Sequence, residues 1–306
     1  MTSGTQTLQH IRQPGAFDYF KLTILGCLWS SAFLCVEIAL QNFSPLVIAN
    51  WRIVIATLTL LPIVWFFKEK WPRSMHVWAL LTGAGFLYNA IPFTLISWGQ
   101  QSISSGMAAL LMSSGPFVAL LLAHVFTADE KFSVIKLIGI CIGFSGVALL
   151  LGAEAFSGSV QTLTGQLAMI AAVSCYVLSS LVIRRIQGVT PLMISMTVLA
   201  TSSVYMLPLV FLVAEPLPPI ANQWSVVALV FLGVFPTAAA YIIRVQMLQQ
   251  VGTTFMAQVS YLIPPFGLFW GWLFLDQVPA NTTWVALLLI LAGLAVTSTK
   301  YARRSS

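Results

Sequence analysis

Hydrophobic residues dominate this chain in ten long stretches that are separated by short polar segments. Each stretch is close to the ~20 residues that an α-helix needs to cross the hydrocarbon core of a bilayer. Turn signals such as Ser44-Pro45, Trp71-Pro72 and Gly188 separate the stretches. The pattern predicts an all-α integral membrane protein with ten transmembrane helices. These helices are expected at roughly residues 19–40, 46–67, 76–98, 103–125, 133–151, 163–186, 190–214, 223–247, 252–274 and 281–299.

The amino-acid composition differs from that of a soluble protein. The chain is 58% hydrophobic and 7% charged, whereas a soluble domain carries about 25% charged residues. The longest stretch without apolar character is the N-terminal tail, residues 1–17. We expect no cleaved signal peptide, because the first apolar stretch is long enough to span and lacks a small-residue cleavage site.

Basic residues fall almost entirely in alternate gaps between the stretches, which predicts an orientation through the positive-inside rule. With the N-terminus in the cytoplasm, the predicted outer loops contain no Lys or Arg, and Arg52 lies inside the second helix. Both termini are then cytoplasmic. The remaining basic residues are all on the cytoplasmic side: Arg12, Lys21, Lys68, Lys70, Arg73, Lys131, Lys136, Arg184, Arg185, Arg244, Lys300, Arg303 and Arg304.

An internal repeat is visible when the chain is aligned with itself at an offset of 149 residues. The predicted units are a cytoplasmic tail at 1–17, a five-helix repeat at 18–152 and a second at 160–302. Because five is odd, the second copy enters the membrane from the opposite side, which is the inverted-topology architecture of many secondary transporters. The matches are Ala79-Leu80 with Ala228-Leu229, Phe86 with Phe235, Gln100-Gln101 with Gln249-Gln250, Met107-Ala108 with Met256-Ala257, and Pro116-Phe117 with Pro265-Phe266.

Several motifs resemble the EamA-type branch of the drug/metabolite transporter superfamily over nearly the whole chain. They are a Trp-Ser-Ser-Ala-Phe run from Trp29 to Phe33, Arg52, Gly-Pro-Phe-Val-Ala-Leu at 115–120 before Asp129-Glu130, and Pro-Pro-Phe at 264–266 before Asp276. Relatives often carry Glu where this chain has Asp276. The resemblance implies ten helices, cytoplasmic termini and transport of small solutes. Within that family, helices 1 and 6 line the transport path.

Mid-helix aromatic and polar side chains are the candidates for substrate contact, because hydrocarbon offers a polar group no partner. Trp29 lies near the middle of its helix, whereas the other nine tryptophans lie toward helix ends, as in the aromatic belts of membrane proteins. The alternative role for these polar groups is a hydrogen bond between helices. The full candidate set is Trp29, Tyr88, Asn89, Ser114, Tyr176, Thr237, Tyr241 and Tyr261.

Repeat-related prolines are the candidates for hinges, since proline removes a helical hydrogen bond and kinks the helix. The two sites are Gly115-Pro116 and Pro264-Pro265, and static kinks are the alternative. Glu37 and Arg52 are the charges set furthest into the outer half, so an ion pair between them is one interpretation. Snorkelling to the interface is another, and proton coupling through Glu37 is a third.

These features predict a secondary transporter that exports amino acids or related small metabolites across a bacterial inner membrane by alternating access. The alternatives are a drug or toxic-cation efflux carrier of the same family and a membrane-embedded enzyme. No Gly-x-x-x-x-Gly-Lys-Ser/Thr motif is present, so we expect no ATP hydrolysis. The four cysteines lack metal-site spacing. We therefore expect no metal, no cofactor, no nucleic-acid partner and no catalytic residue.

Overall fold

The computed structural model describes residues 12–119, 134–157, 160–183, 185–213, 222–256 and 258–302, and these residues contain helices and no strand. Residues 1–11 of the predicted tail, residues 120–125 of the fourth predicted helix and Asp129-Glu130 lie outside them. The elements are α1 (Ala16–Ala39), α2 (Pro45–Phe66), α3 (Met75–Gly85), the π-helix η1 (Phe86–Ala90), α4 (Ile91–Gly99), α5 (Ser105–Met112), α7 (Val134–Ser157), α8 (Val160–Ile183), α9 (Pro191–Val213), α10 (Gln223–Leu232), the π-helix η2 (Gly233–Ala239), α11 (Ala240–Met256), α12 (Val259–Leu275) and α13 (Asn281–Ala302).

Helix length and composition confirm an all-α membrane protein. Six helices of the described residues are long and apolar enough to cross a membrane, and four shorter apolar helices accompany them. Large apolar side chains also face outward, as Trp65 and Leu212 do with exposed fractions of 82% and 84%. Such a surface suits lipid, because hydrocarbon tails are the solvent that it meets. The count of ten spans and the inverted repeat stay predictions.

Local sequence signals explain where several helices begin. Pro45 is the first residue of α2 and follows Ser44, an arrangement that suits the missing N–H and fixed φ of proline. The side chains of Ser104 and Asn222 accept hydrogen bonds from Met107 N and Trp224 N at the starts of α5 and α10. These caps satisfy backbone donors that have no partner within the helix.

Two helices differ from the sequence-based expectation. The fourth predicted helix is broken at Ser113 and Ser114, which form a turn between α5 and the helical residues 115–119. The ninth was expected from residue 252, but Gly252 has φ 82° and ψ 173°, and α12 begins at Val259. Glycine tolerates this left-handed φ without steric cost, so the chain turns there before α12.

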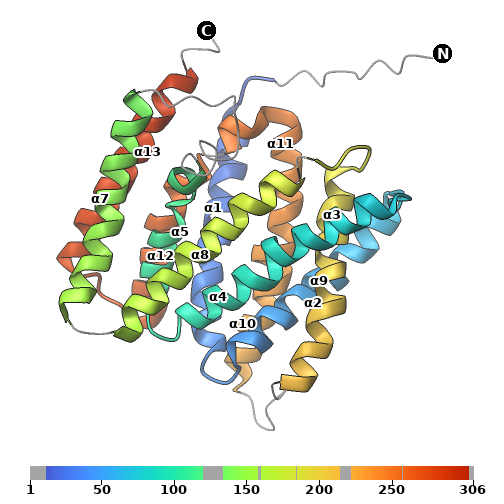
Figure 1. Ribbon diagram of the computed structural model, residues 1–306, viewed down its shortest axis with the longest axis horizontal. Helices are drawn as coiled ribbons and strands as arrows, with labels where there is room; N and C mark the ends of the chain where they lie inside the picture. Colours follow the sequence, from blue (N-terminus) through green and yellow to red (C-terminus); the bar gives the residue numbers. More distant parts are fainter. Residues whose placement is uncertain are drawn as a thin grey trace.

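Helices α7 and α13 form a closely packed pair at one edge of the bundle (Figure 1). A Cβ added to Gly293 of α13 would lie 2.5 Å from Gly143 N and 2.6 Å from Gly139 O of α7. The backbones can approach this closely only because these positions lack side chains. The glycines of the fifth predicted helix therefore serve a contact within the chain.

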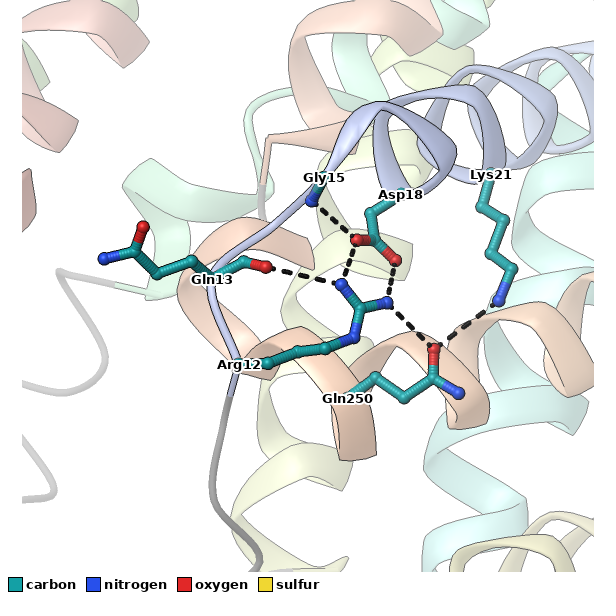
Figure 2. Close-up of polar contacts among 6 residues, drawn as sticks. All are labelled: Arg12, Gln13, Gly15, Asp18, Lys21 and Gln250. Carbon is teal, nitrogen blue, oxygen red and sulfur yellow. Dashed lines mark hydrogen bonds and ion pairs between the residues drawn. The ribbon is translucent and has the colours of Figure 1, made fainter.

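The start of α1 and the end of α13 lie at the same side of the protein (Figure 1), which we call the tail side. The opposite side, where α1 ends and α2 begins, is the far side. Figure 2 shows the polar contacts before α1: both oxygens of Asp18 accept hydrogen bonds from Arg12, at 2.6 and 2.7 Å. Asp18 also accepts from Gly15 N at 2.8 Å, and Arg12 N donates to Gln250 O of α11 at 3.1 Å. Residues 12–15 are thus attached to the helices that they meet.

Candidate functional site

A cavity of about 300 Å³ lies among side chains of α1, α2, η1, α4, α5, α8, η2, α11 and α12. Its volume is at the lower end of the range for small-ligand pockets, which begins at about 300 Å³. Residues before 120 and residues after 160 both contribute to its wall. The lining residues used below are Trp29, Arg52, Tyr88, Phe93, Tyr176, Thr237, Tyr241 and Arg244.

Arg52 is the buried cation of this cavity, with 8% of its surface exposed. Its Nε donates to Thr237 Oγ1 at 2.8 Å, and its Cζ lies 3.8 Å from the centroid of the Phe93 ring. Thr237 Oγ1 in turn donates to Leu232 O at 2.8 Å. The guanidinium is therefore held by one hydrogen bond and by a cation–π contact with an aromatic face.

Three tyrosines form an aromatic wall. The ring centroid of Tyr88 lies 5.1 Å from that of Tyr176 and 5.8 Å from that of Tyr241. Arg244 of α11 lies over the Tyr88 ring of this wall, with its Cζ 5.8 Å from the ring centroid. Aromatic rings at these separations pack favourably and offer a large apolar surface to a ligand.

Two π-helical segments supply parts of the wall. Tyr88 lies in η1 and Thr237 lies in η2, and these residues are separated by the repeat offset of 149 positions. A π-helical turn pairs residues five apart and occurs mostly as a short bulge within an α-helix, frequently at a functional site. The two bulges aim one aromatic and one hydroxyl side chain at the same cavity.

Five of the predicted contact residues come together here: Trp29, Tyr88, Tyr176, Thr237 and Tyr241 all line the cavity. Their contact with substrate stays a prediction.

The other three candidates do not belong to the lining. Asn89 is buried and its Nδ2 donates to Val198 O at 3.3 Å and to Ser202 Oγ at 3.1 Å, so it joins η1 to α9. Ser114 is buried in the turn after α5. Tyr261 packs against the main hydrophobic core.

The two proline sites differ in local structure. Gly115-Pro116 follows directly on the turn at Ser113 and Ser114. Pro264-Pro265 lies inside α12, which continues from Val259 to Leu275. Hinge motion at either site stays a prediction, and the matched sequences do not produce matched helix breaks.

The interpretation of Glu37 and Arg52 as an ion pair is wrong. Glu37 accepts a hydrogen bond from Ser105 N at 2.7 Å and another from Gln277 Nε2, so it joins α1 to the start of α5 and the end of α12. Ser105 Oγ also contacts Gln277 Oε1 at 3.2 Å. Glu37 is directed toward neutral donors at the far side, whereas Arg52 is directed toward the cavity.

Sequence reasoning missed one functional candidate of the cavity wall. The charge pattern assigns Arg244 to the cytoplasmic side, although it falls within the predicted helix 223–247. An ionisable residue within a membrane helix is a functional candidate by default, and this signal applies to Arg244.

Comparisons with known proteins give a consistent result. The EamA-like transporter family matches residues 19–152 and 163–299. The uncharacterized transporter YoaV of Bacillus subtilis is 23% identical over 289 residues, covering 90% of this chain and 95% of the relative. A probable terminal-alkyne amino-acid exporter of Streptantibioticus cattleyicolor is 23% identical over 277 residues, covering 90% of this chain and 91% of the relative.

A solved crystal structure has the same fold. It matches with a TM-score of 0.66 at 18% identity, and the match covers 94% of this chain and 99% of the other. Similarity at this level of identity is informative about fold alone. The family match covers most of the sequence, in two stretches that together include nearly every described helix. The chain therefore belongs to the EamA-like transporter family.

Proposed function

We propose that this protein is a secondary transporter that exports amino acids or related small metabolites across the bacterial inner membrane by alternating access. The observation that carries the proposal is the cavity between side chains from both halves of the chain, with a π-helical segment of each half in its wall. Two related halves around one site can exchange conformations, so that the site opens to each side in turn.

The two stretches matched by the family support a duplicated chain of two units, 18–152 and 160–302. An amino-acid cargo is supported by the name of one relative, the terminal-alkyne amino-acid exporter. The aromatic wall agrees with this cargo, because burial of an apolar side chain contributes about 25 cal/mol per Å² of area removed from water.

Counterflow in proteoliposomes tests the proposal. The purified protein should exchange labelled amino acid against a panel of unlabelled solutes, with and without a pH gradient. A carrier exchanges label across the membrane, whereas an enzyme converts it and a static pore only lets it equilibrate. Chemical conversion of the label, or equilibration without exchange, would contradict the transporter.

Variants of the wall locate the site. Trp29→Ala and Tyr176→Ala should change the ranking of bulky and small amino acids in competition against one labelled substrate. Trp65→Ala is the matched control, because Trp65 is 82% exposed on the outer surface of α2. An unchanged ranking in both wall variants would place these side chains in helix packing alone.

Flexible points are the second requirement of alternating access. We expect Pro116→Ala and Pro265→Ala to slow transport more than they lower folded yield, because Pro116 lies directly after the turn at Ser113 and Ser114 and Pro265 removes a helical hydrogen bond within α12. Transport at the wild-type rate in both variants would mean that these prolines serve helix packing and do not act as hinges. The two π-helices, η1 and η2, would then be the remaining points at which the helices could bend.

A further inference from the structure

The cavity wall has an unbalanced charge. Its two charged residues are Arg52 and Arg244, and the lining residues of the described chain include no Asp or Glu. Four acidic side chains that the structure describes have other partners or face outward: Asp18 binds Arg12, Glu37 binds Ser105 and Gln277, Glu69 accepts from Thr190, and Asp276 is exposed. Tyrosine hydroxyls are neutral at physiological pH, so the aromatic wall supplies no counter-charge.

Arg52 has unused capacity to donate hydrogen bonds. Only its Nε donates to a described residue, and the flat face of the guanidinium is occupied by Phe93. The two terminal nitrogens of Arg52 have no hydrogen-bond partner among the residues that the structure describes. Arg52 also lines the cavity. A buried cation without an anion is costly, and a planar guanidinium matches a carboxylate with two parallel hydrogen bonds.

Arg244 adds a second cation to the cavity wall. It is partly buried and lies over Tyr88, which also stacks near Tyr176 and Tyr241. The Tyr241 hydroxyl is buried without a hydrogen-bond partner among the described residues. The cavity thus combines two cations, the unpaired Tyr241 hydroxyl and an apolar surface.

We propose that this cavity recognises an organic carboxylate with an apolar or aromatic body. Arg52 and Arg244 are its specificity-determining residues. The cavity prefers net anions to zwitterions, and it prefers zwitterions to cations. The inference rests on the proposed transport function and names the substrate class of the same site. A zwitterionic amino acid still offers its carboxylate to Arg52, but its ammonium group meets two cations and no carboxylate. An amine without a carboxylate meets only repulsion, which disfavours toxic-cation efflux.

Three compounds of nearly equal size separate the charge effects: 3-phenylpropionate (anion), phenylalanine (zwitterion) and 2-phenylethylamine (cation). Binding is measured as the shift in thermal unfolding that each compound produces in the purified protein. We expect the largest shift with 3-phenylpropionate, a smaller one with phenylalanine and none with 2-phenylethylamine. Equal or stronger binding of the amine, or no binding of the acid at millimolar concentration, would overturn the inference.

Variants assign the preference to the two arginines. Arg52→Gln and Arg244→Gln should each weaken 3-phenylpropionate about tenfold to a hundredfold, with little change for the amine. Arg52→Lys keeps the charge and loses the planar fork, so it should fall between wild type and Arg52→Gln. Arg185→Gln is the matched control, because Arg185 is an exposed residue beyond the end of α8. If Arg52→Gln does not fold, the partly exposed Arg244 carries the same test, and unchanged affinity for the acid in Arg244→Gln would overturn the inference.

Counterflow distinguishes this inference from the function on which it rests. Binding of 3-phenylpropionate without counterflow of any solute would uphold the carboxylate site and contradict the transporter. Counterflow of phenylalanine that neither 3-phenylpropionate nor the arginine variants affect would uphold the transporter and overturn the carboxylate site.

Discussion

Polar side chains join helix ends at both sides of the protein, and the two networks differ in charge. The far-side network consists of Glu37, Ser105 and Gln277, where one partly buried carboxylate accepts only from neutral donors. The tail-side network consists of Arg12, Gly15, Asp18, Lys21 and Gln250, where the carboxylate is paired with a guanidinium (Figure 2). A carboxylate without a cation depends on its hydrogen bonds, whereas an ion pair with a half-exposed guanidinium is weakened by solvent and salt.

The largest effect is expected when the far-side carboxylate is removed. Glu37→Ala leaves the Ser105 N–H at the start of α5 and the Gln277 amide without their shared acceptor, which costs about 2 kcal/mol for bonds to a charged group. Thermal unfolding of the purified variant measures the loss. Glu69→Ala is the matched control, because Glu69 accepts one hydrogen bond from Thr190 at the tail side. Equal destabilisation by Glu37→Ala and Glu69→Ala would contradict the larger structural role that we assign to the far-side carboxylate.

A smaller effect is expected when the carboxylate becomes an amide. Glu37→Gln keeps one accepting oxygen, so it should lower stability less than Glu37→Ala does. Transport measured against external pH should keep its pH dependence, since we expect proton coupling, if present, to run elsewhere. Selective loss of that dependence at normal expression would instead give the far-side network a role in coupling.

The tail-side network should respond to salt where the far-side network does not. Asp18→Asn removes the ion pair with Arg12 but can keep the acceptor for Gly15 N. Its difference in thermal stability from wild type should shrink as ionic strength rises, because the Arg12 guanidinium is 49% exposed and salt screens its charge. The difference between Glu37→Gln and wild type should stay constant in the same series. Parallel salt curves for the two variants would contradict this contrast.

The smallest effect is expected at the edge of the tail-side network. The Gln250 side chain lies 3.5 Å from both Arg12 and Lys21, at the limit of hydrogen-bond distance, while the Arg12 N–H contacts the Gln250 backbone carbonyl. Gln250→Ala leaves that backbone contact in place. Thermal stability should stay within about 0.5 kcal/mol of wild type, as for an ordinary surface substitution. A larger loss would make the Gln250 amide a structural link between α1 and α11.

The positions of most helices could be predicted from the sequence, because the bilayer demands long apolar stretches and the turns between them are rich in polar residues, Pro and Gly. Trp29, Tyr88 and Tyr176 were predictable for a related reason, since few mid-membrane positions carry a polar tip. The partners of Glu37 were not. They depend on how α1 is rotated against α5 and α12, and hydropathy contains no information about that rotation.

The π-helices were also invisible in the sequence, because they depend on contacts between helices. A Cβ at Gly233, the first residue of η2, would lie 2.6 Å from Ile55 Cβ of α2, and one at Gly85, directly before η1, would lie 2.7 Å from Ser202 Oγ of α9. Close packing at both positions accompanies the change in hydrogen bonding. Sequence periodicity predicts a continuous helix at each site, and the structure differs from it by a local bulge.

Each π-helical segment also shifts the helix that follows it. One residue more in a turn advances the downstream residues by about 100° around the helix axis relative to an uninterrupted α-helix, since a residue of an α-helix turns by that angle. Deleting one residue from η1 should therefore rotate α4 by about 100° about its axis and change the side chains that it presents to α8. The number of residues in these two segments sets the direction in which the side chains of α4 and α11 point, so a one-residue deletion there would be more disruptive than most point substitutions.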